Sequence, residues 1–204
     1  MKSLFPMFVK LDGRRVLVVG AGRVGEPKIR SLLPTGAHIR VVALQASDAV
    51  REWSRNGEIV LEERSFTLSD LDNVFLVVVA TASRDLNELV FLEAQARRIL
   101  CNVVDVPEQC DFFYPAVVQR GDLQIAVSTS GQSPSLAQRI RQQLEKQFGP
   151  GYAQWVVQLG ETRRRVLASD LDPERKRQLL QSLASAEAFE AMVALNSNGR
   201  NDAI

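Results

Sequence analysis

The sequence predicts an α/β fold that begins with a Rossmann-type parallel sheet domain. A β-hairpin/helix dimerisation region and a small all-helical C-terminal domain are expected to follow it. An apolar run at residues 16–19 ends in Gly-x-Gly-x-x-Gly at 20–25 and continues into a segment of helical periodicity. Strand-like and helix-like segments then alternate as far as residue 105, and the segments after the Gly-Pro-Gly break at 149–151 are helical.

Composition and charge exclude several classes of protein. The chain has 204 residues, 46% hydrophobic and 24% charged, with a net charge of +1, so no general field attracts nucleic acid or a membrane surface. No apolar run is long enough to span a membrane, and residues 1–6 lack the apolar core of a secretory signal. Cys101, Cys110 and the single histidine, His38, show neither a disulfide pattern nor metal-ligand spacing. We therefore expect a cytoplasmic protein without a tightly held metal.

The glycine motif carries the strongest chemical signal in the first domain. Gly20 lets the chain turn sharply off the strand, Gly22 lets the backbone approach a pyrophosphate, and Gly25 lets the helix pack closely on the sheet. Pro27 suits the first helical turn, where its missing N–H costs nothing. Free N–H groups at the start of this helix favour phosphate. The alternative is an ordinary strand-to-helix turn without a ligand.

The remaining elements of the first domain follow from apolar runs and breakers. The first helix should stop at 33–36, where Pro and Gly both break it, and the most apolar run, at 74–80, should be a central strand. The expected order is strand, helix, strand, helix, strand, strand, helix, strand. After the first strand and helix, the segments are strand 39–43, helix 48–56, strand 58–62, strand 74–80, helix 84–98 and strand 101–105.

Residues after the second and fourth strands complete the predicted cofactor site. The second strand is followed by Leu44 and Gln45, where many such folds carry an acidic residue for the adenosine ribose. Gln45 can hydrogen-bond a ribose hydroxyl, but the missing carboxylate leaves the choice between NAD and NADP open. The predicted cofactor-binding residues are Gly20, Gly22, Arg23, Val24, Gly25, Leu44, Gln45, Thr81 and Ala82.

The second half of the chain changes in character. Segments 112–118 and 123–128 predict a hairpin, and a helix at 133–148 carries apolar residues on one stripe. A lone hairpin rarely stands by itself, so we expect it to pair with a second subunit. Further helices are predicted at 152–169, 172–183 and 186–195, with a frayed tail at 196–201. The predicted domains are 1–112 for NAD binding, 113–148 for dimerisation and 149–204 for the helical C-terminal domain.

Together these segments resemble the precorrin-2 dehydrogenase family, the dehydrogenase/ferrochelatase part of siroheme synthase. The resemblance covers residues 3–148 and is most specific in Asn-Val-Val-Asp at 102–105 and in Ser-x-x-Gly-x-Ser-Pro-x-Leu-Ala from Ser128. The other matching pieces are the glycine loop with Lys28, Gly36-Ala37, Ala80-Thr81, Asn87 and Pro115-Ala116-Val117-Val118.

The resemblance implies NAD⁺ as the oxidant and a homodimer. It also implies a tetrapyrrole, precorrin-2 or its product sirohydrochlorin, bound between the regions. No methyltransferase domain is appended, so only the later steps of siroheme synthesis are expected. Whether the chain also inserts Fe²⁺ stays open, and iron insertion is ranked below dehydrogenation because no cluster of strong iron ligands is present.

Asp105, at the end of the fifth strand, matches the catalytic aspartate of the family. A carboxylate there can accept the proton that accompanies hydride removal, or orient the substrate. The alternative is a structural aspartate that caps the loop before Pro107.

The many carboxylates of a tetrapyrrole call for nearby cations, hydroxyls and N–H groups. The sequence favours a solvated surface charge over a ligand role for each basic candidate, as for Arg141 and the arginines at 163–165, and Ser133 can equally be a helix cap. The predicted substrate-binding residues are Asn102, Ser128, Thr129, Ser130, Gly131, Ser133, Arg120 and Arg139.

Two functions from other classes remain as alternatives. An NAD(H)-binding redox-sensing regulator would bind dinucleotide without turnover, but the chain carries no basic recognition helix. A structural dimeric scaffold would leave the glycine loop and Asp105 unexplained.

Overall fold

The first part of the chain is built on one parallel sheet. The computed structural model describes residues 4–198, with side chains to residue 194, and the chain divides into two compact units, Met1–Tyr114 and Pro115–Ile204. In the first unit the strand order is β3-β2-β1-β4-β5, with every pair parallel, which confirms the predicted Rossmann-type sheet. The strands are β1 (Arg15–Ala21), β2 (His38–Ala46), β3 (Val60–Glu63), β4 (Leu76–Val79) and β5 (Leu100–Val103).

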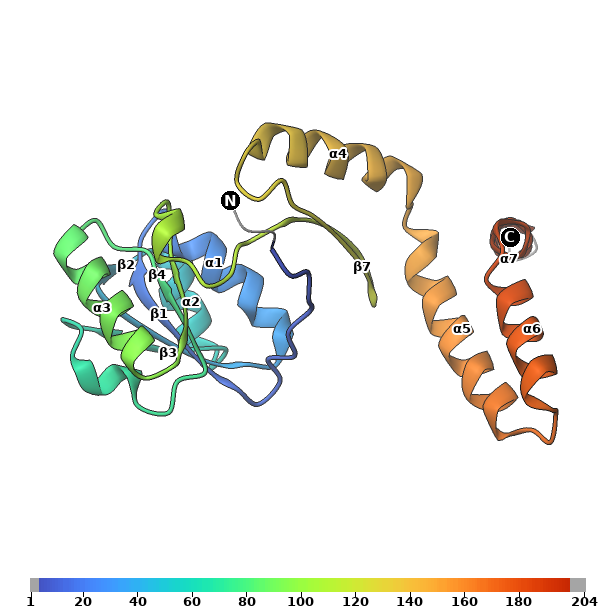
Figure 1. Cartoon of the computed structure of the whole chain (residues 1–204), viewed down its shortest axis with the longest axis horizontal. Coiled ribbons are helices and arrows are strands. Elements are labelled where there is room, and N and C mark those ends of the chain that lie inside the picture. Colours follow the sequence, from blue (N-terminus) through green and yellow to red (C-terminus); the bar gives the residue numbers. More distant parts are fainter. Residues whose placement is uncertain (1–3, 199–204) are drawn as a thin grey trace. The chain divides into compact units, whose positions relative to one another are not determined.

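Helices cover both faces of this sheet (Figure 1). Ile29 of α1 and Val50 of α2 are buried against one face, and Val90 and Ala94 of α3 are buried against the other. Burying each such Val or Ile side chain contributes about 1.5–3 kcal/mol, so two apolar layers hold the sheet. The helices of this unit are α1 (Gly25–Leu32), α2 (Asp48–Arg55) and α3 (Arg84–Ala96), with short 3-10 helices η1 (Leu33–Thr35), η2 (Leu68–Leu71) and η3 (Pro107–Gln109).

The strand order reverses on either side of β1. The chain proceeds from β1 to β2 and β3 on one side, then crosses to β4 and β5 on the other. Parallel strands carry their carboxyl ends at one edge, and the crevice at such a reversal is where ligands bind in open α/β sheets. The fold therefore places the loops after β1 and β4 side by side.

Most predicted boundaries lie within a few residues of the observed ones. The first helix ends at Leu32 and passes through η1 to Gly36, whose φ of 72° makes the expected stop. The second strand runs past its predicted end at residue 43, because Ala46 pairs with Ala21 beyond a register shift that places the extra residues in β2. The predicted fifth strand, 101–105, ends at Val103 instead, so Asp105 lies in a turn with a φ of 65°.

The second unit holds the hairpin and the remaining helices. Its elements are β6 (Ala116–Arg120), β7 (Leu123–Val127), α4 (Pro134–Gln147), α5 (Gly151–Ala168), α6 (Pro173–Leu183) and α7 (Ala186–Asn198). The hairpin is confirmed, but its first strand begins at Ala116 rather than at 112. Asp172 caps α6 by accepting a hydrogen bond from the Arg175 N–H at 3.0 Å, and Tyr152 stacks against Phe189 with ring centroids 4.2 Å apart. The last helix continues to Asn198, and the rest of the predicted frayed tail lies outside the described residues.

The described part of the chain holds neither a candidate membrane span nor a metal-binding cluster. None of the helices within residues 4–198 combines the length and apolar character needed to cross a bilayer. In the same part, no three histidine, cysteine or carboxylate side chains gather as a metal site requires. His38 is exposed at the start of β2, and Cys101 is buried in the core beside Asn102.

Candidate active site

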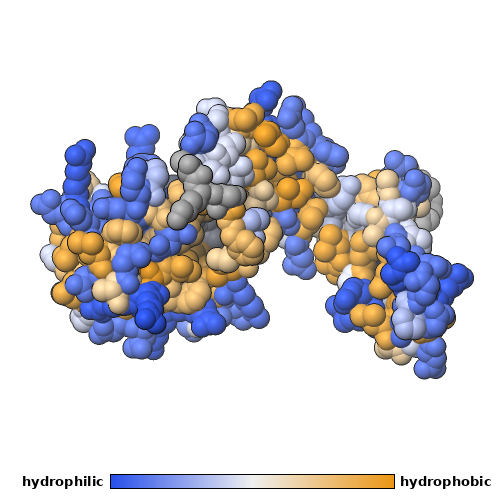
Figure 2. All heavy atoms as spheres, viewed as in Figure 1, coloured by the Kyte–Doolittle hydropathy of each residue, from blue (hydrophilic) through white to orange (hydrophobic). Residues whose placement is uncertain are grey.

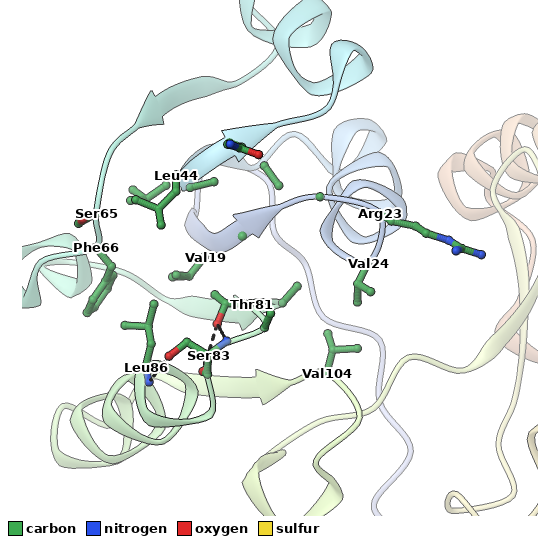
Figure 3. Close-up of a pocket in the computed structure, with 18 of the residues that line it drawn as sticks. Val19, Arg23, Val24, Leu44, Ser65, Phe66, Thr81, Ser83, Leu86 and Val104 are labelled. Carbon is green, nitrogen blue, oxygen red and sulfur yellow. Dashed lines mark hydrogen bonds between the residues drawn. The ribbon is translucent and has the colours of Figure 1, made fainter.

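A cavity of about 690 Å³ opens at the carboxyl edge of the sheet in the first unit. Its walls come from the loops after β1 and β4 and from the ends of β2 and β3 (Figure 3). Of the predicted cofactor-binding residues, Gly25 alone does not line it. The residues that do are Gly20, Gly22, Arg23, Val24, Leu44, Gln45, Thr81 and Ala82.

The three glycines of the loop differ in what surrounds them. Gly20 has a φ of 102°, and a Cβ there would lie 2.4 Å from the Ala80 carbonyl oxygen. A Cβ on Gly25 would lie 2.2 Å from the Gly20 carbonyl oxygen, so this glycine allows α1 to approach the strand. A Cβ on Gly22 would meet no atom within 4 Å. Gly20 and Gly25 therefore serve the fold, and Gly22 keeps the backbone open toward the cavity.

The start of α1 is suited to an anion. No side chain caps this helix, whereas Ser47 caps α2 and Ser83 caps α3. The Arg23 side chain extends away from the cavity (Figure 3), so the loop presents backbone N–H groups rather than a cation. A phosphate at this position would meet the positive end of the helix dipole.

The loop after β4 is held by a buried amide. Thr81 donates its hydroxyl to the Asn87 Oδ1 at 2.6 Å, and the Asn87 Nδ2 donates back to the Thr81 carbonyl at 3.2 Å. The Thr81 hydroxyl also accepts the Ser83 N–H at 3.2 Å (Figure 3). Asn87 is 9% exposed, so it acts from beneath the loop and fixes the cavity wall at Thr81.

One end of the cavity is apolar, and sequence reasoning identified only part of it. Leu44 faces Val19, Phe66 and Leu86 there, with Ser65 beside them (Figure 3). A flat aromatic ring such as adenine fits between side chains of this kind. No local signal marks Phe66 or Leu86, because each reaches the cavity only through the crossover connections of the sheet.

A charged cluster borders this apolar end. Arg64 lines the cavity, yet its five N–H donors are all bound: Nε and Nη2 donate to Glu62, Nη1 and Nη2 to Asp70, and Nη1 to the Ser65 carbonyl. Asp70, 1% exposed, also accepts from Arg40 at 2.9 Å. The Arg64 guanidinium is the main reason that the pKa of Asp70 falls to about 2. Arg64 is thus a structural cation without a spare donor.

A carboxylate does stand at the end of β2, but it comes from another strand. Glu63, the last residue of β3, accepts the Ala46 N–H at 3.2 Å and is paired with Arg51 at 2.8 Å. Sequence reasoning missed it because it considered only the residues that follow β2 in the chain.

Asp105 lies at the other end of the cavity, beside Val104. Its side chain is exposed, and within residues 4–198 no hydrogen bond reaches its carboxylate, so the structural alternative of a loop cap has no support there. A φ of 65° is uncommon for residues other than glycine but is tolerated by Asp and Asn. Such backbone strain at a cavity is typical of functional residues.

Asn102 lies in the core rather than at the cavity. It is 5% exposed, and its Nδ2 donates to the Phe112 carbonyl at 2.7 Å and to the Cys110 Sγ at 3.3 Å. These bonds tie the segment after η3 to β5. The contacts account for Asn102 structurally and indirectly hold the turn that carries Asp105.

The other predicted substrate-binding residues belong to the second unit. The Ser133 hydroxyl caps α4 by accepting the Leu136 N–H at 3.3 Å, and Thr129 accepts the Ser133 N–H at 3.1 Å. Ser128 accepts the Ser130 N–H at 3.1 Å, and Gly131 follows with a φ of 79°. The loop is therefore ordered by its own side chains.

The two arginines predicted with that loop differ in their surroundings. Arg120 donates to the Phe148 and Glu145 carbonyls at 2.9 and 3.2 Å, so it binds the end of α4. Arg139 is exposed and forms no ion pair within the described part of the chain. Of the two, Arg139 is the cation left available for a ligand.

Comparison with known proteins identifies the family. Residues 7–116 match a family model described as putative NAD(P)-binding, and residues 120–147 match one described as sirohaem biosynthesis protein central. The solved structure of SirC, a precorrin-2 dehydrogenase, matches with a TM-score of 0.80 and 30% identity over 97% of this chain and 98% of that one. This chain belongs to the precorrin-2 dehydrogenase family. The resemblance stated from the sequence is confirmed.

Two siroheme synthases are also similar to this chain. Siroheme synthase 1 of Serratia proteamaculans is 45% identical over 140 residues, which are 69% of this chain and 29% of that protein. Siroheme synthase 2 of Pectobacterium atrosepticum is 38% identical over 161 residues, which are 79% of this chain and 35% of that protein. The chain thus spans about a third of the length of these curated relatives.

Proposed function

We propose that this chain oxidises precorrin-2 to sirohydrochlorin with NAD⁺. The observation that carries the proposal is the cavity, in which an open glycine loop at one wall and an unbonded carboxylate, Asp105, line the same space. The match to SirC over nearly its whole length supports the same reaction for this chain.

The residues present fit a dinucleotide. The backbone at Gly22 would hold the pyrophosphate, and the apolar end at Leu44 and Phe66 would hold the adenine. With the dinucleotide so oriented, Val104 and Asp105, which line the same cavity, would border the nicotinamide. Bound there, the nicotinamide supplies a hydride acceptor.

The protein's own contribution is positioning and proton transfer. The rigid loops at Gly20 and Thr81 hold the reacting centres in place, which lowers the entropic part of the barrier. Asp105 accepts the proton that the macrocycle loses with the hydride, because its carboxylate is exposed at the cavity and no neighbour occupies it.

The charges at the end of β2 favour NAD⁺ over NADP⁺. A 2′-phosphate needs a cation with free donors, and the donors of Arg64 are taken by Glu62, Asp70 and a carbonyl. Arg51, near the same strand end, is likewise held, because it is paired with the Glu63 carboxylate at 2.8 Å. The 2′-hydroxyl of NAD⁺ can instead bond Gln45 or Ser65, which line the cavity.

We assign residues 113–148 to dimerisation and residues 149–204 to a helical domain, and we place the reaction in the cytoplasm. The free thiols of Cys101 and Cys110 support a reducing compartment. The sirohaem biosynthesis model at residues 120–147 supports a role for the hairpin and α4 in the same pathway.

The deciding experiment is an anaerobic assay of the purified chain with precorrin-2. We expect NAD⁺-dependent formation of sirohydrochlorin, with a higher kcat/KM for NAD⁺ than for NADP⁺. Tight NAD⁺ binding without turnover would instead support a redox-sensing regulator. Adding Fe²⁺ to sirohydrochlorin tests iron insertion, which we expect to be slower than dehydrogenation because no metal-binding cluster is found within residues 4–198.

A further inference from the structure

A second cavity, of about 490 Å³, opens at the amino edge of the parallel sheet, where β1 to β4 begin. We call it the amino-edge cavity. Its lining comes from the first residues of β1 and β2, from the start of β3 and from the connection between η2 and β4. Its volume lies in the range of small-molecule sites, which runs from about 300 to 1,000 Å³. It shares no lining residue with the cavity assigned to the dinucleotide, so the proposed reaction does not account for it.

The strand register places three basic side chains on one face of the sheet at this edge. Arg15 of β1 pairs with His38 of β2, and Arg40 follows two residues after His38. Paired residues of parallel strands point to the same face, and so do residues two apart on one strand. Neighbouring strands lie about 4.8 Å apart and a two-residue step covers about 6.6 Å, so the three side chains start close together. All three line the amino-edge cavity.

Most donors of these three side chains are unused within the described part of the chain. The side chains of Arg15 and His38 are exposed and form neither a hydrogen bond nor an ion pair there. Arg40 donates through Nη2 alone, to the Asp70 carbonyl at 2.7 Å and to the Asp70 Oδ1 at 2.9 Å. Its Nη1 stands 3.6 Å from the Glu62 Oε1, beyond hydrogen-bonding distance. Buried Asp70 therefore anchors the Arg40 guanidinium and leaves its Nε and Nη1 donors for a ligand.

The same cavity also offers oxygen acceptors. Asp72 is engaged by Arg97 at 2.7 Å, whereas Glu58 is exposed and accepts only a long hydrogen bond from the Asn56 Nδ2, at 3.4 Å. The Asn73 side chain also lines the cavity and forms no hydrogen bond within the described residues. Carboxylate and amide oxygens accept hydrogen bonds from hydroxyl groups. The lining therefore fits a ligand that carries an anionic group and, apart from it, several hydroxyls.

We propose that the amino-edge cavity binds a phosphorylated sugar, with its phosphate at Arg15, His38 and Arg40. The sugar hydroxyls then lie toward Glu58 and Asn73. A phosphate group presents three acceptor oxygens, one for each basic side chain, whereas a carboxylate presents two. Guanidinium groups bind phosphate through two parallel hydrogen bonds, which favours arginine at such a site. This binding site is separate from the reaction at the carboxyl edge and does not depend on it.

His38 gives the proposal a direct spectroscopic test, because it is the only histidine of the chain. In protein without an affinity tag, the imidazole Cε1–H signal in the NMR spectrum therefore belongs to this cavity. Ribose 5-phosphate, added at fixed pH and ionic strength, should shift that signal saturably. Inorganic phosphate should shift it with a higher Kd, and ribose should leave it unchanged. Equal affinities for inorganic phosphate and ribose 5-phosphate would overturn the assignment of the hydroxyl end.

The variants Arg15→Gln and His38→Gln test the phosphate end, and both alter exposed side chains, so the fold should persist. Losing a charge-assisted hydrogen bond should raise the Kd for ribose 5-phosphate about 10–100-fold, measured by calorimetry. Arg55→Gln is the matched control, because Arg55 is an exposed cation of the same unit that lines neither cavity. Its Kd should stay within about twofold of the wild type.

Gly22→Ala distinguishes the two cavities, because Gly22 lines only the one assigned to the dinucleotide. Ribose 5-phosphate should bind this variant as it binds the wild type. Three results would overturn the proposal: no saturable shift of the His38 signal, binding that is lost in Gly22→Ala but kept in Arg15→Gln, or an equal loss in Arg55→Gln and Arg15→Gln. The last result would show a diffuse effect of net charge rather than a site.

Discussion

At the scale of single residues, the glycines of the loop have different roles: one is required by the fold and another leaves room for the ligand. A side chain at Gly20 would collide with the Ala80 backbone and would need an unfavourable φ, so Gly20→Ala should destabilise the protein itself. Gly22 differs, because a Cβ there would enter open space. Substitution of Gly20 should therefore lower the stability of the fold, whereas substitution of Gly22 should weaken ligand binding.

Gly22→Ala is expected to change the free energy of unfolding by less than about 1 kcal/mol, since the methyl group meets no protein atom. The Kd for NAD⁺ should rise at least about tenfold, because the methyl occupies the path of the pyrophosphate. Thermal unfolding and calorimetric titration measure the two quantities. Gly149→Ala, equally open, is the matched control and should alter neither. An unchanged Kd for NAD⁺ would place the pyrophosphate elsewhere.

Asp105→Asn should leave the fold and NAD⁺ binding intact but lower kcat about 10²–10⁴-fold, because the swap removes the basic oxygen. Asparagine also tolerates the φ of 65° at this position, so backbone strain should not change. Single-turnover kinetics with precorrin-2 measure the loss, and Glu108→Gln, an exposed neighbour, is the control. Activity within a few-fold of the wild type would make Asp105 structural.

At the scale of elements, the Asp70 cluster joins η2 to the edge of the sheet. The Asp70 carboxylate accepts hydrogen bonds from Arg40 of β2, from Arg64 just after β3 and from the Thr67 N–H, the last at 2.8 Å. Arg64 and Phe66 reach the apolar end of the cavity from the same segment. The cluster therefore fixes the wall that we assign to adenine.

Asp70→Asn should lower the free energy of unfolding by about 2 kcal/mol at pH 7, since the pKa of Asp70 falls from 3.8 to about 2 on folding. A depressed carboxyl pKa stabilises the fold above its unfolded value and loses that effect as the pH falls. The difference between wild type and variant should thus be full above about pH 5 and shrink steadily as the pH falls toward 2, the folded pKa of Asp70. Urea denaturation across this range measures it.

Asp72→Asn is the control for that experiment. Asp72 pairs with Arg97 at the surface and is 62% exposed, so its loss should matter little. Equal effects of the two substitutions, or an effect of Asp70→Asn that does not fall between pH 5 and pH 2, would contradict the role given to the buried carboxylate.

At the scale of the whole molecule, the second unit leaves apolar side chains uncovered. Val117 of β6 is 39% exposed and Leu136 of α4 is 38% exposed, and orange residues reach the surface in the region of α4 (Figure 2). A two-stranded hairpin with one such helix buries little by itself. A second copy of the same hairpin and helix is the partner that we expect to cover it.

Light scattering should therefore give about twice the 22.7 kDa mass of one chain at micromolar concentration. Val117→Asp should shift the protein toward the monomer, because it places a charge in the expected interface. Val60→Asp, a comparable change on the exposed edge of the first unit, should leave the mass unchanged. A 22.7 kDa wild-type protein would refute the dimer.

The parts of the site that could be predicted from the sequence are those with a local physical cause. Gly20 and Gly25 follow from the conformation of a single turn, and the Ser133 cap of α4 follows from the need of a helix start for an acceptor. Asp105 is predicted from its strand-end position and from the family's Asn-Val-Val-Asp motif, and its catalytic role stays a prediction. The predicted strand ends were less accurate, because where a strand ends depends on its pairing with a partner strand, as Ala46 pairs with Ala21.

The sequence by itself determined the strand-turn-helix unit, the alternation that makes the sheet parallel, and the position of the cofactor loop. Only the tertiary structure decided which distant side chains complete the site. Arg64 has no free donor because Asp70 and Glu62 are folded against it, and the carboxylate that stands at the end of β2 is Glu63 of the neighbouring strand. Hydrophobic periodicity is a property of neighbours along the chain, whereas these contacts join segments that only the crossovers of a parallel sheet bring together.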